Sequence, residues 1–248
     1  MTFKKSALRN TCAATMLAVP AGIASAGGYT APVEPIVVAP AAEVASPLAW
    51  QGGYVGATIG MAGLGDDRVG ISQFDGPVLA RAGELEAGGL NYGLRAGYRI
   101  QRVVRNRNIV FGAELGLEGG DIGDEVSEAG YDSNLEVDKV LALRFKTGIL
   151  NPAQDTMFYG IAGVARGDFN MSINGTGAAG AVALDESFSN NGYIVGLGVE
   201  RKLNANWSVT GEWEYANFGK THLEDATGKS TEATPDYHNI KLGVNYSF

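Results

Sequence analysis

The chain has 248 residues, a formal net charge of −8 and 45% hydrophobic residues, which suits one domain or two small ones and is too hydrophobic for a disordered chain. No stretch reaches the roughly 18 apolar residues that a transmembrane helix needs, so a helical membrane protein is excluded. The acidic balance argues against nucleic acid as a partner, and 2 histidines with 1 cysteine leave little for zinc or thiol chemistry.

Residues 1–26 contain the three parts of a secretory signal peptide. Three basic residues precede an uncharged run over residues 11–24, and residues 24–26 read Ala-Ser-Ala, a small-residue cleavage pattern. The exported chain then begins at Gly27, carries a net charge of −11 and contains no cysteine. Because it has no disulfides, packing alone must hold its fold.

Residues 27–49 form the next segment, which contains Pro32, Pro35, Pro40 and Pro47. Proline at this density favours extended conformations and excludes a helix or a central strand. The sequence therefore predicts an Ala/Pro-rich periplasmic tether ahead of a domain over residues 50–248.

From residue 50 to the end, apolar residues alternate with polar or small ones, which is typical of strands with two different faces. Eight segments of about ten residues are predicted, the length a tilted strand needs to cross a bilayer. One of them, 156–166, is apolar or small on both faces, so its orientation stays open. The predicted strands cover residues 50–62, 90–100, 109–118, 141–149, 156–166, 193–200, 207–215 and 239–248.

The connections between these strands are alternately long and short. Residues 101–108, 151–155 and 201–206 are short turns with a summed charge of +4, whereas four connections of roughly twenty residues sum to −14. Such sorting is typical of bacterial outer-membrane barrels, which carry long loops outside and tight turns in the periplasm. The sequence predicts an all-β fold, an eight-stranded antiparallel up-and-down transmembrane β-barrel. The long connections cover residues 63–89, 119–138, 167–191 and 219–235.

The polar face of the strands indicates which side is inside. It carries five basic and five acidic residues, and glycines fill the positions between them. Buried charges need partners, and an eight-stranded barrel has just enough room for side chains. We therefore predict an interior charge network of Arg95, Arg99, Glu114, Glu118, Arg144, Lys146, Glu200, Glu212, Glu214 and Lys241.

Aromatic residues gather at both ends of the predicted strands, as membrane interfaces favour. One set belongs to the long-loop rim: Tyr92, Tyr193, Trp213 and Tyr215. The other belongs to the short-turn rim: Trp50, Tyr98, Phe111, Tyr159, Trp207, Tyr246 and Phe248.

The segment 192–200, followed by Asn206-Trp207-Ser208 and Glu212, resembles the small outer-membrane β-barrel proteins of Gram-negative bacteria. The resemblance is greatest to the porin-like surface antigens of alpha-proteobacteria, whose barrels are similar to the membrane domain of outer membrane protein A. Residues 50–60, 111–114 and the ending 242–248 match the same pattern. The resemblance implies an outer-membrane location. It also implies two alternatives to a structural role, a narrow porin or a receptor for a small ligand such as heme.

Three motifs suggest other chemistry. Residues 175–180 match the dinucleotide pattern G-x-G-x-x-G, but no strand–helix context surrounds them. The acidic residues Asp121, Asp124, Glu125 and Glu128 fit no known calcium loop. A hydrolase built from His222, Glu224 and Ser230 would lie in one mobile loop with nothing rigid to orient the base. We therefore predict no enzyme activity, cofactor or metal.

The expected function is structural: an envelope-stabilising surface antigen of the outer membrane. Its expected partners are outer-membrane lipid and lipopolysaccharide, together with periplasmic chaperones and the barrel-assembly machinery. Tyr246 and Phe248 resemble the terminal signal that this machinery reads.

Overall fold

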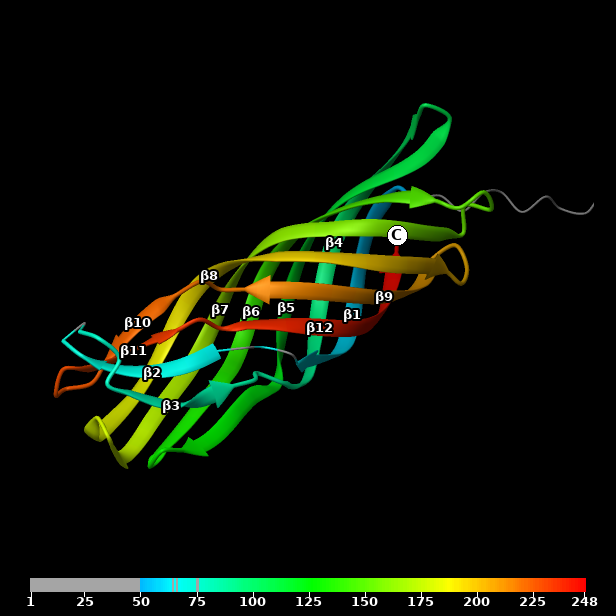
Figure 1. Ribbon diagram of the computed structural model, residues 1–248. Helices are drawn as coiled ribbons and strands as arrows, with labels where there is room; N and C mark the ends of the chain where they lie inside the picture. The colour runs from blue at the N-terminus through cyan, green and yellow to red at the C-terminus, as the bar shows by residue number, and fades with distance from the viewer. Residues whose placement is uncertain (1–49, 64, 66, 75) are drawn as a thin grey trace, which may run out of the picture. The chain divides into compact units, whose positions relative to one another are not determined.

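A computed structural model describes residues 50–63, 65, 67–74 and 76–248 (Figure 1). The predicted signal peptide and tether lie outside the described residues. Among those residues, no helix is long and apolar enough to cross a membrane.

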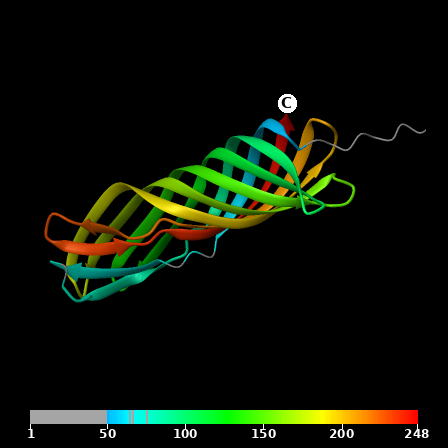
Figure 2. The same cartoon turned by 90° about the horizontal axis from the view of Figure 1, so that it is seen from above.

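Eight antiparallel strands close into a barrel in the order β1-β12-β9-β8-β7-β6-β5-β4, which confirms the predicted fold (Figures 1 and 2). Neighbours along the chain pair with each other, and β1 pairs with β12 to close the ring. The barrel strands are β1 (Gly52–Gly63), β4 (Gly89–Val104), β5 (Arg107–Glu128), β6 (Tyr131–Leu150), β7 (Thr156–Gly177), β8 (Gly180–Lys202), β9 (Trp207–Asn217) and β12 (Asp236–Ser247).

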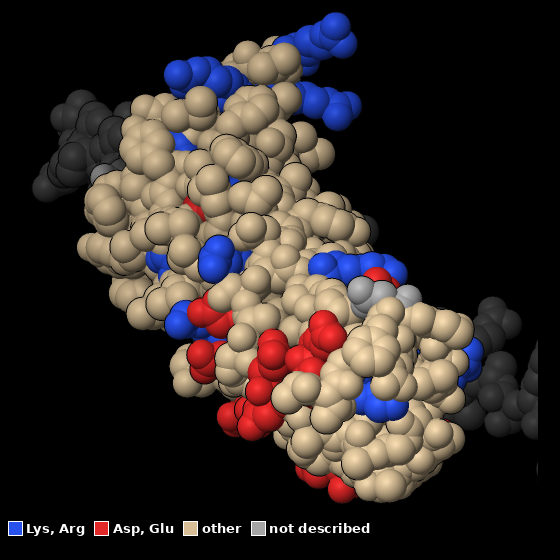
Figure 3. All heavy atoms as spheres, turned by 90° about the vertical axis from the view of Figure 1, so that its left-hand side faces the viewer, with Lys and Arg blue, Asp and Glu red and all other residues tan. Residues whose placement is uncertain are grey.

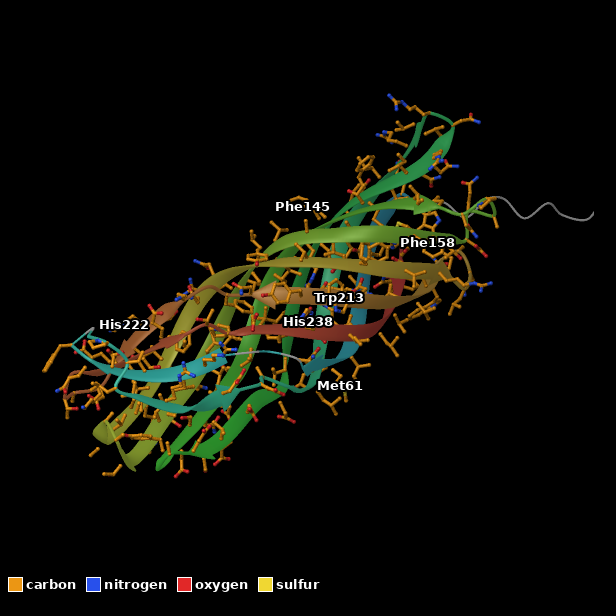
Figure 4. The ribbon with its side chains drawn as sticks, viewed as in Figure 1. Met61, Phe145, Phe158, Trp213, His222 and His238 are labelled. Atoms are coloured by element: carbon orange, nitrogen blue, oxygen red, sulfur yellow. The ribbon has the colours of Figure 1, made fainter. Side chains whose placement is uncertain are left out.

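The alternating sequence separates the two faces of the barrel wall. In β12, Ile240 and Leu242 are 66% and 65% exposed, whereas Lys241 between them is 2% exposed. The same alternation in the other strands produces an outward band of aliphatic and aromatic side chains, among them the labelled Met61, Phe145 and Phe158 (Figure 4). This band is the surface that a barrel presents to lipid.

The long connections were predicted as loops, and this is wrong. Strands β5 to β8 are 20 to 23 residues long and continue far beyond the predicted ends. The other two long connections contain β2 (Asp67–Gln73), β3 (Ala80–Leu85), β10 (Thr221–Glu224) and β11 (Lys229–Ala233), which form a second sheet in the order β10-β11-β2-β3. We call these four strands and the adjoining ends of β5 to β8 the extension.

The extension is ordered because it has its own apolar core. Phe169, Met171 and Ile173 alternate along β7 and are each 1% exposed. Phe169 packs edge-to-face on Phe218, with the ring centroids 4.9 Å apart. Burial of these side chains stabilises strands that would otherwise be exposed ribbons. Other members of this core are Val69, Ile71, Leu85, Leu135, Val137, Val182 and Leu184.

The short-turn end is closed by tight turns and a buried tryptophan. Arg105 and Asn106 both have positive φ (48° and 65°), as a two-residue hairpin turn with the right-handed twist requires. Trp50 is 2% exposed, and its indole Nε1 donates a hydrogen bond to the backbone oxygen of Gln154 (2.8 Å). Its predicted position in the outer aromatic rim is therefore wrong.

The orientation of β7, which the sequence left open, follows from its register. Tyr159 pairs with Gly148 on β6 and Gly198 on β8, and it is 4% exposed. Phe158 and Val164 face outward instead. Tyr159 therefore lies inside the barrel and not in the short-turn rim, because glycines on both neighbouring strands leave space for its ring.

Candidate functional site: the charged barrel interior

The ten charged residues predicted for the interior all point into the barrel. Nine of them are 8% exposed or less, and the side chain of Glu118 is 11% exposed. They come from β4, β5, β6, β8, β9 and β12, so the network joins strands from all around the ring. Each basic residue lies within 4.0 Å of at least one carboxylate.

Glu212 on β9 lies at the centre of the first cluster. Its carboxylate accepts two hydrogen bonds from Arg95 Nη1 (3.1 and 3.0 Å) and one from Lys146 Nζ (2.8 Å). Lys146 also donates to Glu114 Oε2 (2.7 Å), which lies 3.7 Å from Arg95 Nε. Two cations and two carboxylates therefore neutralise each other across the lumen.

A second cluster of four charges has the same composition. Arg144 Nε donates to Glu214 Oε1 (2.9 Å), and its Nη2 contacts Glu118. Lys241 bridges the same two carboxylates, with Nζ 3.0 Å from Glu118 Oε1. Every charge in the cluster thus has two opposite partners.

Besides the two clusters, Arg99 and Glu200 form a separate ion pair. Arg99 Nη1 lies 2.9 Å from Glu200 Oε1. Asn245 Nδ2 donates to Glu200 Oε1 (3.1 Å), and its own Oδ1 accepts from Arg95 Nε (2.9 Å). Asn245 therefore links this pair to the first cluster.

Interior glycines provide the space for these long side chains. A Cβ atom added at Gly116 would lie 2.6 Å from Arg144 Nη1, and one at Gly243 would lie 2.5 Å from Arg95 Nη2. Such contacts are too close for real atoms, so a larger residue at either position would displace the arginine from its place in the network.

The predicted network left out several residues of the interior, among them Asn245, Tyr54 and Tyr159. Tyr54 donates a hydrogen bond to Glu114 Oε2 (2.8 Å), and its ring centroid lies 4.1 Å from Arg99 Cζ. Tyr159 donates to Glu212. Lys202, one of the basic residues next to the short turns, is 7% exposed at that end of the barrel, with Nζ 5.2 Å from the Trp50 ring centroid. The place of Tyr54 on the polar face was a usable signal; the ambiguous strand 156–166 hid Tyr159.

The other sequence motifs lie in the extension. Residues 175–180 form the hairpin between β7 and β8, so no helix follows them, as a dinucleotide motif would require. His222, Glu224 and Ser230 lie on the β10–β11 hairpin rather than in a loop, where His222 pairs with Glu232 and Glu224 with Ser230. His222 and Ser230 line one polar cleft, and Figure 4 shows His222 far from His238, which stacks on Trp213.

The acidic residues of β5 line a polar cleft on the outside of the extension. Asp121, Asp124 and Glu125 line it together with Glu136 and Asp138 of β6. Asp124 Oδ2 accepts a hydrogen bond from the backbone N–H of Glu86 (2.9 Å). Within the described part of the chain, no three His, Cys, Asp or Glu side chains are grouped so as to hold a metal ion. Figure 3 shows acidic side chains gathered on one flank of this end.

Two aspartates outside the barrel wall stabilise turns. In the β10–β11 turn, burial opposes ionisation of Asp225, but the Thr227 hydroxyl and the N–H groups of Thr227 and Lys229 prevail and lower its pKa. At the β6–β7 turn, hydrogen bonds from Asn151 and Thr156 lower the pKa of Asp155. Both carboxylates are therefore charged at neutral pH.

The interior arrangement fits a neutral, tightly bonded filling. Its carboxylates are held by cations from other strands, and its polar groups bond across the lumen.

Comparisons with known proteins agree with this fold. A family model described as "Outer membrane protein beta-barrel domain" matches residues 35–248. The chain is 29% identical over 223 residues to the 31 kDa outer-membrane immunogenic protein of Brucella melitensis, covering 86% of this chain and 91% of that protein. It is also 29% identical over 202 residues to the 22 kDa outer membrane protein of Rhizobium leguminosarum bv. viciae, covering 80% and 78%.

Solved structures are similar at lower identity. The outer membrane protein OprG from Pseudomonas aeruginosa superimposes with a TM-score of 0.49 at 14% identity, covering 80% of this chain and 96% of that one. Neisserial surface protein A gives a TM-score of 0.41 at 15% identity, covering 79% and 97%. On the family match, the chain belongs to the outer-membrane β-barrel proteins and resides in the outer membrane.

Proposed function

We propose that this protein is a non-enzymatic structural barrel that stabilises the outer membrane and presents its extension as a surface antigen. The observation that carries this proposal is the filled interior. Ten charged side chains of balanced sign bond across the lumen, and an apolar core fills the extension beyond them. Filled interiors of eight-stranded barrels act as cores rather than as channels.

The antigenic part of the proposal rests on the extension and on one relative. The Brucella protein is named an immunogenic outer-membrane protein. In this chain the extension is a set of paired strands with its own apolar core, which offers antibodies a folded surface. Antibodies raised against the folded protein should label intact cells. Labelling that needs permeabilised cells would contradict surface display.

Deletion of the gene in its host tests the structural role. We expect deletion to increase leakage of periplasmic enzymes and sensitivity to detergent, and we expect the wild-type protein to restore both. A deletion strain with an intact envelope but slower uptake of a small solute would favour the narrow porin. Lipid A of unchanged mass in the deletion strain would agree with a protein that does not modify lipid.

A further inference from the structure

An apolar groove of about 620 Å³ runs along the outer wall of the barrel, over β1, β12, β9 and β8. Its floor is low because Ala57 and Gly211 face outward between larger neighbours. Val199 and Leu242 are the residues paired with Gly211, and they form the sides of the groove. In a membrane this wall is covered by acyl chains.

One end of the groove carries a positive charge. Arg201 lines it at the short-turn end, and its side chain is 68% exposed. Asp155 lies 3.9 Å away, a distance that leaves most of the five guanidinium donors available. Trp207 and Tyr246 pack edge-to-face at the same end, with ring centroids 5.1 Å apart, as interfacial aromatics do.

We propose that this groove is a binding site for one phospholipid of the leaflet on the short-turn side. An acyl chain lies over Gly211, and the lipid phosphate binds the Arg201 guanidinium. The apolar length of the groove matches the acyl chain of a phospholipid, and its cationic end matches the phosphate. Arginine is suited to bidentate contact with phosphate. The loop-length rule assigns this leaflet to the periplasmic side.

Gly211 allows the groove to be filled without disturbing the barrel. A Cβ atom added there would lie 3.8 Å from Val199 Cγ1 and 4.0 Å from Leu242 Cδ2, which is ordinary contact. Gly211→Val therefore blocks the groove with little strain. Gly160→Val on β7 is its matched control, because an added Cβ there meets nothing within 4 Å and Gly160 is not part of the groove.

Arg201→Gln removes the cation and keeps a polar side chain. Arg107→Gln is its control, because Arg107 is an exposed arginine in the hairpin between β4 and β5, outside the groove. Heat-modifiable gel mobility identifies the variants that fold, and Gly211→Ala serves as a milder filling variant should the valine prevent assembly.

Native mass spectrometry measures the affinity for the most tightly bound lipid. The full mature chain is released from micelles that contain increasing amounts of phosphatidylglycerol. We expect Arg201→Gln to weaken that binding roughly tenfold, the loss typical of a charged hydrogen bond. Gly211→Val should weaken it about fourfold for each methylene that loses its contact. Both control variants should bind as the wild type does.

Lipids that differ in one part identify what the site recognises. Diacylglycerol with the same chains lacks the phosphate and should bind at least about tenfold more weakly to the wild type. Equal binding of diacylglycerol, unchanged binding by either groove variant, or preference for lipid A would overturn the proposal. A dimer that Gly211→Val dissociates would assign the groove to a second copy instead.

Discussion

Glu212 is the residue on which the interior charge network depends most. It contacts Arg95, Lys146 and Tyr159, and each of these would lose a partner with it. A buried cation without its partner costs about 3–5 kcal/mol, less where water enters. We therefore expect Glu212→Leu to lower the temperature at which the protein loses its compact gel mobility.

Two further variants show whether the effect of Glu212→Leu comes from the lost charge pairing or would follow the removal of any glutamate. Glu232→Leu removes the acid of an exposed pair with Lys220 and should leave the melting temperature nearly unchanged, because exposed pairs contribute little. Adding Arg95→Met to Glu212→Leu should partly restore stability by removing the stranded cation. Equal melting of wild type and Glu212→Leu would contradict an interior position for this charge.

At the residue scale, period-two alternation was sufficient to assign the charged side chains to one face. Glu212 and Glu214 flank Trp213, so they share the face opposite that ring. Which charge meets which could not be predicted. Arg144 pairs in register with Glu114 but bonds to Glu118 and Glu214, because long side chains reach diagonally across the lumen.

Among the elements, the extension departs most from the sequence-based expectation. Long connections rich in glycine and acid were interpreted as loops, although apolar alternation continues through Phe169, Met171 and Ile173. These residues share one apolar core with residues of β2, β3, β10 and β11, which come from other connections. Burial that depends on strands from other parts of the chain cannot be inferred from the sequence of one segment alone.

The β10–β11 hairpin should open in acid. A lowered Asp225 pKa means that its carboxylate stabilises the turn above the unfolded pKa, about 3.9, and that this stability is lost as pH falls through the lower folded value. The protection of the β11 amides against hydrogen exchange, relative to the intrinsic exchange rate at each pH, should therefore fall below that pH. Asp225→Ala should lower this protection already at neutral pH, and pH-independent protection in the wild type would contradict this role.

Phe248 directly follows the last strand, β12, and is the residue that we propose as the assembly signal. Phe248 is 75% exposed, and its N–H donates to the Gly53 carbonyl (3.1 Å), where β1 and β12 close the barrel. We propose that the barrel-assembly machinery reads this ring, with Tyr246 on the same outward face. Deleting Phe248 should lower the outer-membrane yield and leave protease-sensitive material in the periplasm. Normal insertion of the shortened chain would refute the assignment.

On the scale of the whole barrel, charge is divided between its two ends. Acidic side chains line the cleft of the extension, whereas Lys and Arg side chains project at the top of Figure 3, where the β4–β5 hairpin lies in Figure 1. An acidic rim repels the phosphates of lipopolysaccharide unless divalent cations lie between them. We propose lipopolysaccharide as a partner that binds in this way.

Calcium or magnesium should therefore strengthen association with lipopolysaccharide more than sodium at equal ionic strength. Neutralising Asp121, Asp124, Glu136 and Asp138 together should remove that difference, and neutralising Glu224 alone should not. Co-sedimentation with lipopolysaccharide vesicles measures this association in each salt. Equal binding in sodium and in calcium would argue against bridging cations.

The central claim is that the interior is a bonded core with no open path for ions. Single-channel recording of the refolded wild-type protein in a planar bilayer tests it most directly, once flotation with vesicles has shown that the protein is inserted. The neutral charge clusters and the apolar core of the extension predict a closed baseline with very small steady conductance. Wide, stable channels would contradict the filled interior and make the protein a porin.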